Sequence, residues 1–321
     1  MVYKIIRLTD LNLEDNRFHF TLNPSDRRLL RSVSEIGVMQ PVIVILRQNR
    51  PVLIDGWRRV EAARSCGLEQ LPVLEIAEKT DDLAVFLLAF FENYGQRPFS
   101  LAEKSLAIRK FHDFELHPAE IIGRILPLLE LPPERWMFEL MLEVSQLEKR
   151  FLETIHHRDW KPVAVELLMK FTPAERDWLF SLLEKLTHGQ QREVMERLYS
   201  LKRKTGKSLD QLAREERLAG LIARVLKGER AAVDDLLTVL RRVSSPLISR
   251  LNQAIAEEIR QIGLPERVRL DYDPSLEKRV LRLTLEAAEQ GDLKRAVDSL
   301  ADSLERGYWK RLFQLLGYEG E

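Results

Sequence analysis

LIDGWRRVEAARSCG, residues 53–67, joins the end of an apolar, strand-like run to a segment whose apolar residues recur at helical spacing. Gly56 lies at the junction, where a glycine lets the backbone approach a ligand closely. A helix that begins near Trp57 would direct its free amide groups and the positive end of its dipole toward the same point. Arg58 and Arg59 add planar guanidinium groups, which match phosphate oxygens better than lysine does. The stretch predicts a phosphate site, although a surface helix that starts with two solvated arginines fits these residues equally well.

The segments around this turn predict a small α/β domain. Short β-branched runs are typical of strands, and they occur at 3–8, 41–46, 51–54 and 71–76. Residues 25–37 and 57–67 instead have helical spacing, and both end in glycine. The polar sequence RQNR at 47–50 has the length of a hairpin loop, so we expect the second and third strands to be antiparallel.

Helical patterns replace the strand patterns after about Ser100. Ser100 precedes Glu103 by three residues, as in a capping box, and the following segments are amphipathic. Residues 267–287 alternate on either side of an Asp-Pro turn, which predicts a hairpin, and helical spacing then returns. We therefore expect three regions, with boundaries at 1–99, 100–205 and 206–321, the last of them with dimer contacts.

Composition excludes several classes of protein. The 321 residues contain 50 lysines and arginines and 50 aspartates and glutamates, so any site for a polyanion must be local. A single cysteine, Cys66, excludes a disulfide framework, and the six histidines lack a zinc spacing. The N-terminus lacks a signal-peptide pattern and the apolar runs are too short to span a bilayer, so we expect a cytoplasmic protein with no membrane partner.

A second polar cluster, FFENYGQRPFS at 90–100, follows an apolar helical pattern. Glu92 and Asn93 offer hard oxygen ligands, which suit a magnesium ion that is shared with phosphate. Arg97 could add another contact to an anion. A polar tail at the end of a helix is the alternative interpretation of the same residues.

The order of these motifs resembles the ParB N-terminal domain. The resemblance is carried by DGWRRVEAARSCGLEQLPV at 55–73, ENYGQR at 92–97 and SLAEKSLA at 100–107, together with the upstream stretches NRFHF at 16–20 and LLRSVSEIGVMQPVIV at 29–44. Two positions depart from the family pattern. Trp57 stands where the family usually has glutamate or another polar residue, and Gln96 takes the place of an arginine, with Arg97 displaced by one.

The resemblance implies an α+β ParB/sulfiredoxin-like domain that binds a nucleoside triphosphate, CTP or another one, with Mg²⁺. A mainly helical domain with a degenerate helix-turn-helix would follow, and then a small helical C-terminal unit with a hairpin. Carried over by position, Gly56, Arg58 and Arg59 would hold phosphates. Arg17 and Gln40 would flank the nucleotide. The metal ion would bind to Glu92 and Asn93, and Asn93 would also contact the nucleotide.

The resemblance also implies DNA binding, for which the charges give a mixed indication. The expected recognition helix spans residues 134–144. The surrounding segment 118–160 contains eight acidic and five basic residues. A groove-reading helix needs cations, so we expect this helix to pack rather than to read DNA. Between 197 and 230 ten basic residues outnumber four acidic ones, and the predicted DNA contacts are Lys202, Arg203, Lys204 and Lys207, although a solvated linker would have the same composition.

The function that the resemblance implies is a nucleotide-dependent switch in DNA partitioning or DNA-associated regulation, in a homodimer with a partner ATPase. One alternative is a phosphotransferase, a nuclease-type enzyme or a weak CTPase on the same fold, with Glu14, Asp15 or Asp55 as a candidate base. Another alternative is a protein-interaction module that has lost DNA binding.

Overall fold

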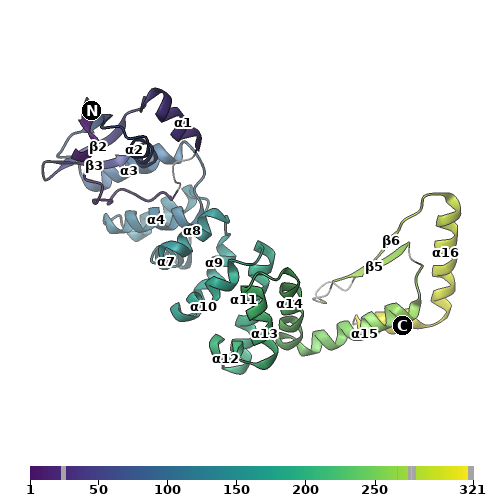
Figure 1. The fold of residues 1–321 in the computed structure, drawn as a ribbon. Helices are drawn as coiled ribbons and strands as arrows, with labels where there is room; N and C mark the ends of the chain where they lie inside the picture. Colours follow the sequence, from purple (N-terminus) through teal and green to yellow (C-terminus); the bar gives the residue numbers. More distant parts are fainter. Residues whose placement is uncertain (23–26, 266, 274–275, 277–279, 317–321) are drawn as a thin grey trace. The chain divides into compact units, whose positions relative to one another are not determined.

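The computed structural model describes residues 1–22, 27–265, 267–273, 276 and 280–316. The chain forms two compact units, Met1–Thr172 and Pro173–Glu321, and each is described by itself (Figure 1). The three predicted regions, with boundaries after residues 99 and 205, remain a prediction about the folding units.

The first unit begins with a mixed four-stranded sheet, and all four predicted strands are confirmed. The strands are β1 (Val2–Arg7), β2 (Val42–Arg47), β3 (Arg50–Asp55) and β4 (Gln70–Ile76). Their order is β1-β4-β2-β3, with β2 parallel to β4 and the other pairs antiparallel. Strand β3 is therefore an edge strand, and the predicted phosphate site begins at its last residue, Asp55.

The predicted hairpin between β2 and β3 is confirmed. Gln48 and Asn49 have φ angles of 52° and 59°, and a two-residue loop with both residues in this left-handed region matches the twist of the paired strands. Pro51 lies in β3 at the sheet edge, where the missing amide hydrogen disrupts no pairing on the open side.

Two helices pack on this sheet, α2 (Trp57–Ser65) and α3 (Asp82–Tyr94), and α1 (Arg27–Ile36) packs against α2. A short 3₁₀ turn, η1 (Leu8–Asp10), follows β1. Val60 of α2 packs with Val42, Val44 and Leu53 in one apolar cluster, and Trp57 lies against it. Strand residues alternate between faces, so Ile43 and Ile45 point away from this cluster. Asp81 caps α3 by accepting a hydrogen bond from the amide of Ala84 at 3.2 Å.

The rest of the first unit is helical, as predicted. Its elements are α4 (Leu101–Asp113), α5 (Pro118–Glu120), η2 (Ile121–Ile125), α6 (Leu126–Leu128), α7 (Arg135–Val144), α8 (Lys149–His157) and α9 (Pro162–Met169). The capping box of Ser100 and Glu103 is present at the start of α4. The π-helical turn η2 directly precedes α6, which contains Pro127, whose ring would clash with a carbonyl of a regular α-helix.

Helix α7 is the helix that was expected to be a recognition helix. Met137, Phe138 and Met141 are buried in it, which agrees with the prediction that its apolar residues pack in the core. Trp136 is 43% exposed on the same helix. Most of the apolar surface of α7 is therefore used within the first unit.

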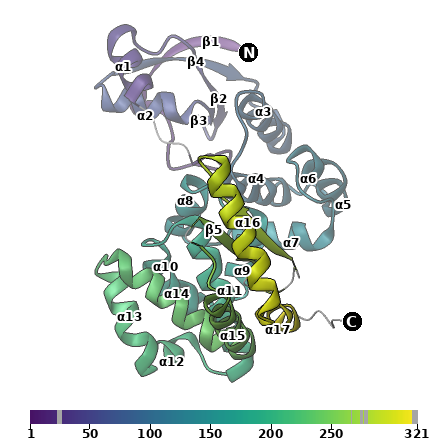
Figure 2. The same cartoon turned by 90° about the vertical axis from the view of Figure 1, so that its right-hand side faces the viewer.

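The second unit consists of helices and one hairpin (Figure 2). Its elements are α10 (Pro173–Leu183), α11 (His188–Thr205), α12 (Leu209–Ala213), α13 (Glu216–Leu226), α14 (Arg230–Ser244), α15 (Pro246–Ile262), β5 (Val268–Tyr272), β6 (Leu281–Leu285), α16 (Gln290–Glu305) and α17 (Tyr308–Leu315). The predicted hairpin is confirmed as the antiparallel pair β5 and β6, although five residues of its turn, 274–275 and 277–279, lie outside the described residues. Ile255 of α15 packs with Trp309 and Leu312 of α17. Among the described residues, no helix has both the length and the apolar character to cross a membrane.

Candidate functional site

The turn between β3 and α2 requires glycine at position 56. Gly56 has a φ angle of 103°, and a Cβ atom added there would lie 2.6 Å from Val42 Cγ1. The amide of Val60 donates to the carbonyl oxygen of Gly56 at 3.0 Å, which starts α2. The free amides of the first turn of α2 therefore lie next to Gly56, which has no side chain to block a ligand. A phosphate site requires this arrangement.

Asp55 and Arg59 hold this turn in place. Arg59 Nη2 donates to Asp55 Oδ2 at 2.7 Å, while Nη1 donates to the carbonyl oxygens of Gln40 and Pro41 at 3.0 and 2.7 Å. Asn93 Nδ2 donates to Asp55 Oδ1 at 2.9 Å. Asp55 is only 7% exposed, and a buried carboxylate must be paired. Arg59 of α2 balances its charge, and Asn93 of α3 donates a further hydrogen bond.

These residues line one cavity of about 290 Å³, which we call the Gly56 cavity. Five of the predicted site residues meet in it, namely Gln40, Gly56, Arg58, Arg59 and Asn93. Gln96 and Arg97 of the second polar cluster also line it. Thr21 and Leu29 complete the wall; neither was expected from the sequence, although Thr21 directly follows the NRFHF stretch.

Arg17 lies elsewhere. It forms ion pairs with Asp15 at 2.8 Å and with Asp82 at 3.0 Å, and the hydrogen bond to Asp15 raises the pKa of Arg17. Asp82 begins α3 and Asn93 lies near its end. At 1.5 Å per residue these two positions are about 16 Å apart along the helix, so Arg17 lies far from the Gly56 cavity.

Glu92 also lies outside the residues that line the cavity, and its side chain is exposed. Successive helical residues point about 100° apart, so Glu92 and Asn93 face different directions. In the described part of the chain, no group of three or more His, Cys, Asp and Glu side chains is arranged to hold a metal ion. Magnesium binding by Glu92 and Asn93 stays a prediction.

Arg97 connects the Gly56 cavity to a second buried carboxylate. Its guanidinium donates to Glu103 Oε2 at 2.8 Å and to Glu103 Oε1 at 2.6 Å. Glu103 is completely buried and also accepts from the amides of Leu22 and Ser100, at 2.9 and 3.1 Å. Burial alone would raise the pKa of Glu103, but the bonds from Arg97 and from these amides hold it below its usual value.

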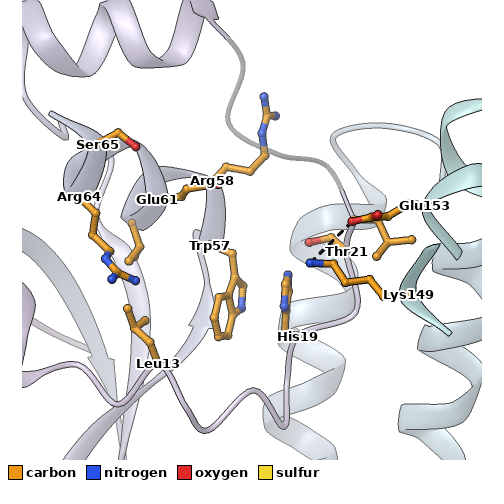
Figure 3. A pocket seen from close by; sticks show the side chains of 12 residues that line it. Leu13, His19, Thr21, Trp57, Arg58, Glu61, Arg64, Ser65, Lys149 and Glu153 are labelled. Carbon is orange, nitrogen blue, oxygen red and sulfur yellow. Dashed lines mark ion pairs between the residues drawn. The ribbon is translucent and has the colours of Figure 1, made fainter.

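A larger cavity of about 540 Å³ adjoins the first and shares Thr21, Trp57 and Arg58 with it (Figure 3). The rings of His19 and Trp57 stack there, with centroids 4.2 Å apart and an interplanar angle of 19°. Burial lowers the pKa of His19 to about 4, so this ring is neutral at pH 7. In Figure 3, Lys149 lies on the side of His19 that faces away from Trp57.

The four predicted DNA contacts lie in the second unit around the end of α11. Lys202 Nζ pairs with Glu175 at 2.6 Å, and Lys207 Nζ pairs with Glu215 at 2.8 Å. The ammonium of Lys204 donates to the carbonyl oxygen of Ser244. Arg203 is exposed. Part of the basic charge in this segment is therefore used in contacts within the unit, and the DNA assignment stays a prediction.

Part of the chain matches a known family model. Residues 17–94 match the model of the ParB N-terminal domain. The chain is a ParB-like protein, and its N-terminal α/β domain followed by a mostly helical region is the predicted fold.

Two curated relatives are chromosome-partitioning proteins. The chain is 26% identical over 236 residues to the chromosome-partitioning protein Spo0J of Thermus thermophilus, a match that covers 68% of this chain and 81% of that protein. It is 24% identical over 163 residues to the probable chromosome-partitioning protein ParB of Borreliella burgdorferi, covering 49% of this chain and 58% of that protein.

Solved structures of ParB proteins are similar in part. C-terminally truncated ParB from Caulobacter crescentus in complex with CTP-gamma-S has 17% identity and a TM-score of 0.27, over 70% of this chain and 99% of that one. The same protein in complex with the centromeric parS site has 15% identity and a TM-score of 0.29, over 74% and 99%. The Pnob8-like ParB-N domain has 16% identity and a TM-score of 0.35, over 76% and 98%.

Proposed function

We propose that this ParB-like protein binds a nucleotide at the Gly56 turn and uses it as a switch in DNA partitioning. The observation that carries the proposal is the single cavity in which Gln40, Gly56, Arg58, Arg59 and Asn93 meet. The family to which these motifs belong implies CTP as the nucleotide. The names of the curated relatives support the partitioning role.

The proposed roles of the two arginines differ. Arg59 is held by Asp55 and by two carbonyl oxygens, so in this conformation it shapes the turn and adds positive charge behind it. Arg58 lines both neighbouring cavities and is the arginine that we propose contacts phosphate. The Gly56 cavity is small for a whole nucleotide, and we propose that the nucleoside extends toward the stacked rings of His19 and Trp57.

Magnesium fits this site only in part. Each Asp55 oxygen already accepts a hydrogen bond, and Glu92 would have to turn inward to join Asn93. Because Mg²⁺ often binds through phosphates and water with few protein ligands, we propose that the nucleotide would carry most of its coordination. Both Asp55 oxygens are held by Arg59 and Asn93, so we propose a binding switch rather than a phosphotransferase.

DNA, a second copy of the chain and a partner ATPase are the partners that we propose. Lys204 and Lys207 are exposed like Arg203, but they and Lys202 already make polar contacts within the described residues. We therefore propose Arg203 as the first residue to test for a contact to DNA phosphates.

Calorimetry with CTP, ATP and GTP, with and without Mg²⁺, tests the nucleotide proposal. Arg58→Ala removes a charged donor that is worth about 1.5 to 3 kcal/mol, so CTP affinity should fall by about ten- to a hundredfold. Arg50→Ala, at an exposed position of β3, is the matched control and should bind as the wild type does. Equal CTP affinity in the wild type and Arg58→Ala, or no heat with any nucleotide, would contradict the proposal.

A further inference from the structure

Arg97 is shared by two cavities of the first unit. It lines the Gly56 cavity together with Arg58 and Asn93, and it also lines a cavity of about 770 Å³ beside the start of α4. The Arg97 side chain is 26% exposed, while that of its partner Glu103 is completely buried. The guanidinium group of Arg97 therefore holds a buried carboxylate and is also within reach of a ligand in the Gly56 cavity.

The other donors to Glu103 are neutral. The amide of Leu22 donates to Glu103 Oε1 at 2.9 Å, and Leu22 follows Thr21, which lines the Gly56 cavity. The amide and the hydroxyl group of Ser100 donate to Glu103 Oε2 at 3.1 and 3.3 Å. A buried carboxylate needs a positive charge beside it, and among these donors Arg97 is the one that supplies it.

His156 is a second base beside the same carboxylate. It lies near the end of α8, and its side chain is 10% exposed. Its Nδ1 lies 2.8 Å from Ser100 Oγ and 3.6 Å from Glu103 Oε2. Burial lowers the pKa of His156 below its usual value; the charge of Glu103 raises this pKa, and the charges of His157 and Arg97 lower it. While Arg97 pairs with Glu103, the His156 ring is therefore mostly neutral at pH 7.

The other charged groups near this ring act elsewhere. Helix α8 packs against α4, and the remaining charged side chains that line the 770 Å³ cavity are Lys104, Glu130, Asp159 and Lys161. Asp159 and Lys161 pair with each other at 2.5 Å, and the charges of Glu130, Lys161 and Asp159 act on Lys104. The protonation of His156 therefore depends on how Arg97 and Glu103 are paired.

A nucleotide in the Gly56 cavity would compete with Glu103 for Arg97. A guanidinium group forms the same paired hydrogen bonds with phosphate oxygens as with a carboxylate. Once Arg97 turns to phosphate, Glu103 is left buried with neutral donors, which is strongly unfavourable. The His156 ring can restore the balance by taking a proton from the solvent. Resting on the proposed nucleotide site, we propose that nucleotide binding draws Arg97 away from Glu103 and that His156 takes up a proton in its place.

This exchange makes nucleotide affinity depend on pH through a residue that lies outside the Gly56 cavity. Because the nucleotide-bound state binds the extra proton, CTP should bind more tightly as the pH falls through the pKa of His156. A buried opposite charge at this distance favours the protonated ring by about tenfold or more. The protonated ring would also replace a neutral contact between α8 and the start of α4 with an ion pair to Glu103.

Calorimetry of CTP binding to the full chain, in buffers of different ionisation enthalpy, measures the proton. CTP has a titrating phosphate of its own, so the comparison is between the wild type and His156→Gln, whose amide can still bond to Ser100 Oγ but does not titrate. At pH 7 the wild type should take up more protons than this variant. The ratio of wild-type to variant CTP affinity should rise about tenfold as the pH falls from about 8 to about 5.5.

His157→Gln is the matched control, because His157 is the exposed neighbour whose ring contacts His156, and this variant should keep the wild-type proton uptake. An NMR titration of the His156 ring with and without CTP needs no variant, and the pKa of His156 should be higher with CTP. Equal proton uptake in the wild type and His156→Gln, or an unchanged His156 titration with CTP bound, would overturn the inference and leave nucleotide binding standing. A wild type that binds no CTP would instead refute the nucleotide site, and this inference with it.

Discussion

Replacing Arg59 with alanine should destabilise the strand-to-helix turn, because one guanidinium group joins three segments there. It donates to Asp55 and to the carbonyl oxygens of Gln40 and Pro41. The Arg59 and Asp55 side chains are only 14% and 10% exposed. Removing one partner of a buried ion pair leaves an uncompensated charge and costs about 3 to 5 kcal/mol. Asp55 keeps the hydrogen bond from Asn93, and both side chains of the pair are slightly exposed. The free energy of unfolding should therefore fall by about 3 kcal/mol, the lower end of this range.

A double-mutant cycle isolates the ion pair from the rest of the turn. Asp55→Ala alone leaves the Arg59 charge with carbonyl acceptors, whereas the double variant Asp55→Ala/Arg59→Ala buries neither charge. The double variant should therefore be more stable than the sum of the single losses predicts, with a coupling of about 2 kcal/mol. Arg50→Ala on the exposed hairpin should change stability by less than about 0.5 kcal/mol.

Hydrogen exchange of the peptide that covers residues 53–67, followed across urea concentrations, is the suitable assay, because the chain has two compact units and one global unfolding transition is not assured. Strictly additive losses in the cycle would refute the ion pair as the element that holds the turn. A loss below about 1 kcal/mol in Arg59→Ala would refute it too.

Two further predictions concern the same part of the sheet. Gly56→Ala should cost about 3 kcal/mol by the same exchange assay, because the added Cβ would lie 2.6 Å from Val42 Cγ1 at a φ angle of 103°; a variant as stable as the wild type would contradict the geometry of the turn. The pKa of His19 falls to about 4 on folding, so the stability from its neutral form is present above pH 6.5 and is lost as the pH falls toward 4, by about 3 kcal/mol. His19→Phe keeps a stacked ring that does not titrate, so the wild type should lose about 3 kcal/mol relative to this variant as the pH falls from 6.5 to 4; parallel pH profiles would count against this.

The features that were predicted correctly depend on short-range chemistry. The glycine at the end of an apolar run, the RQNR hairpin and the Ser100 capping box each involve residues a few positions apart, and the structure contains all of them. Their backbone requirements are local, so a single sequence is enough to find them.

The positions of Arg17 and Glu92 required tertiary information. The sequence places Glu92 beside Asn93, but the rotation of α3 against β3 decides which of the two reaches Asp55, and Asn93 does. Arg17 follows a turn whose direction the sequence does not specify, and its partner Asp82 lies at the opposite end of α3 from the cavity.

The motifs that resemble the ParB N-terminal domain also hold two buried carboxylates. Asp55 is held by Arg59 from its own motif and by Asn93 from the next one, while Arg97 from that second motif holds Glu103. A variant of Arg59 or Asn93 therefore changes the packing of Asp55 together with any phosphate contact. Arg58 lines the cavity from the first turn of α2. Loss of CTP binding in Arg58→Ala with an unchanged exchange rate at 53–67 would assign nucleotide recognition to Arg58, and a parallel loss of both would assign Arg58 to the fold.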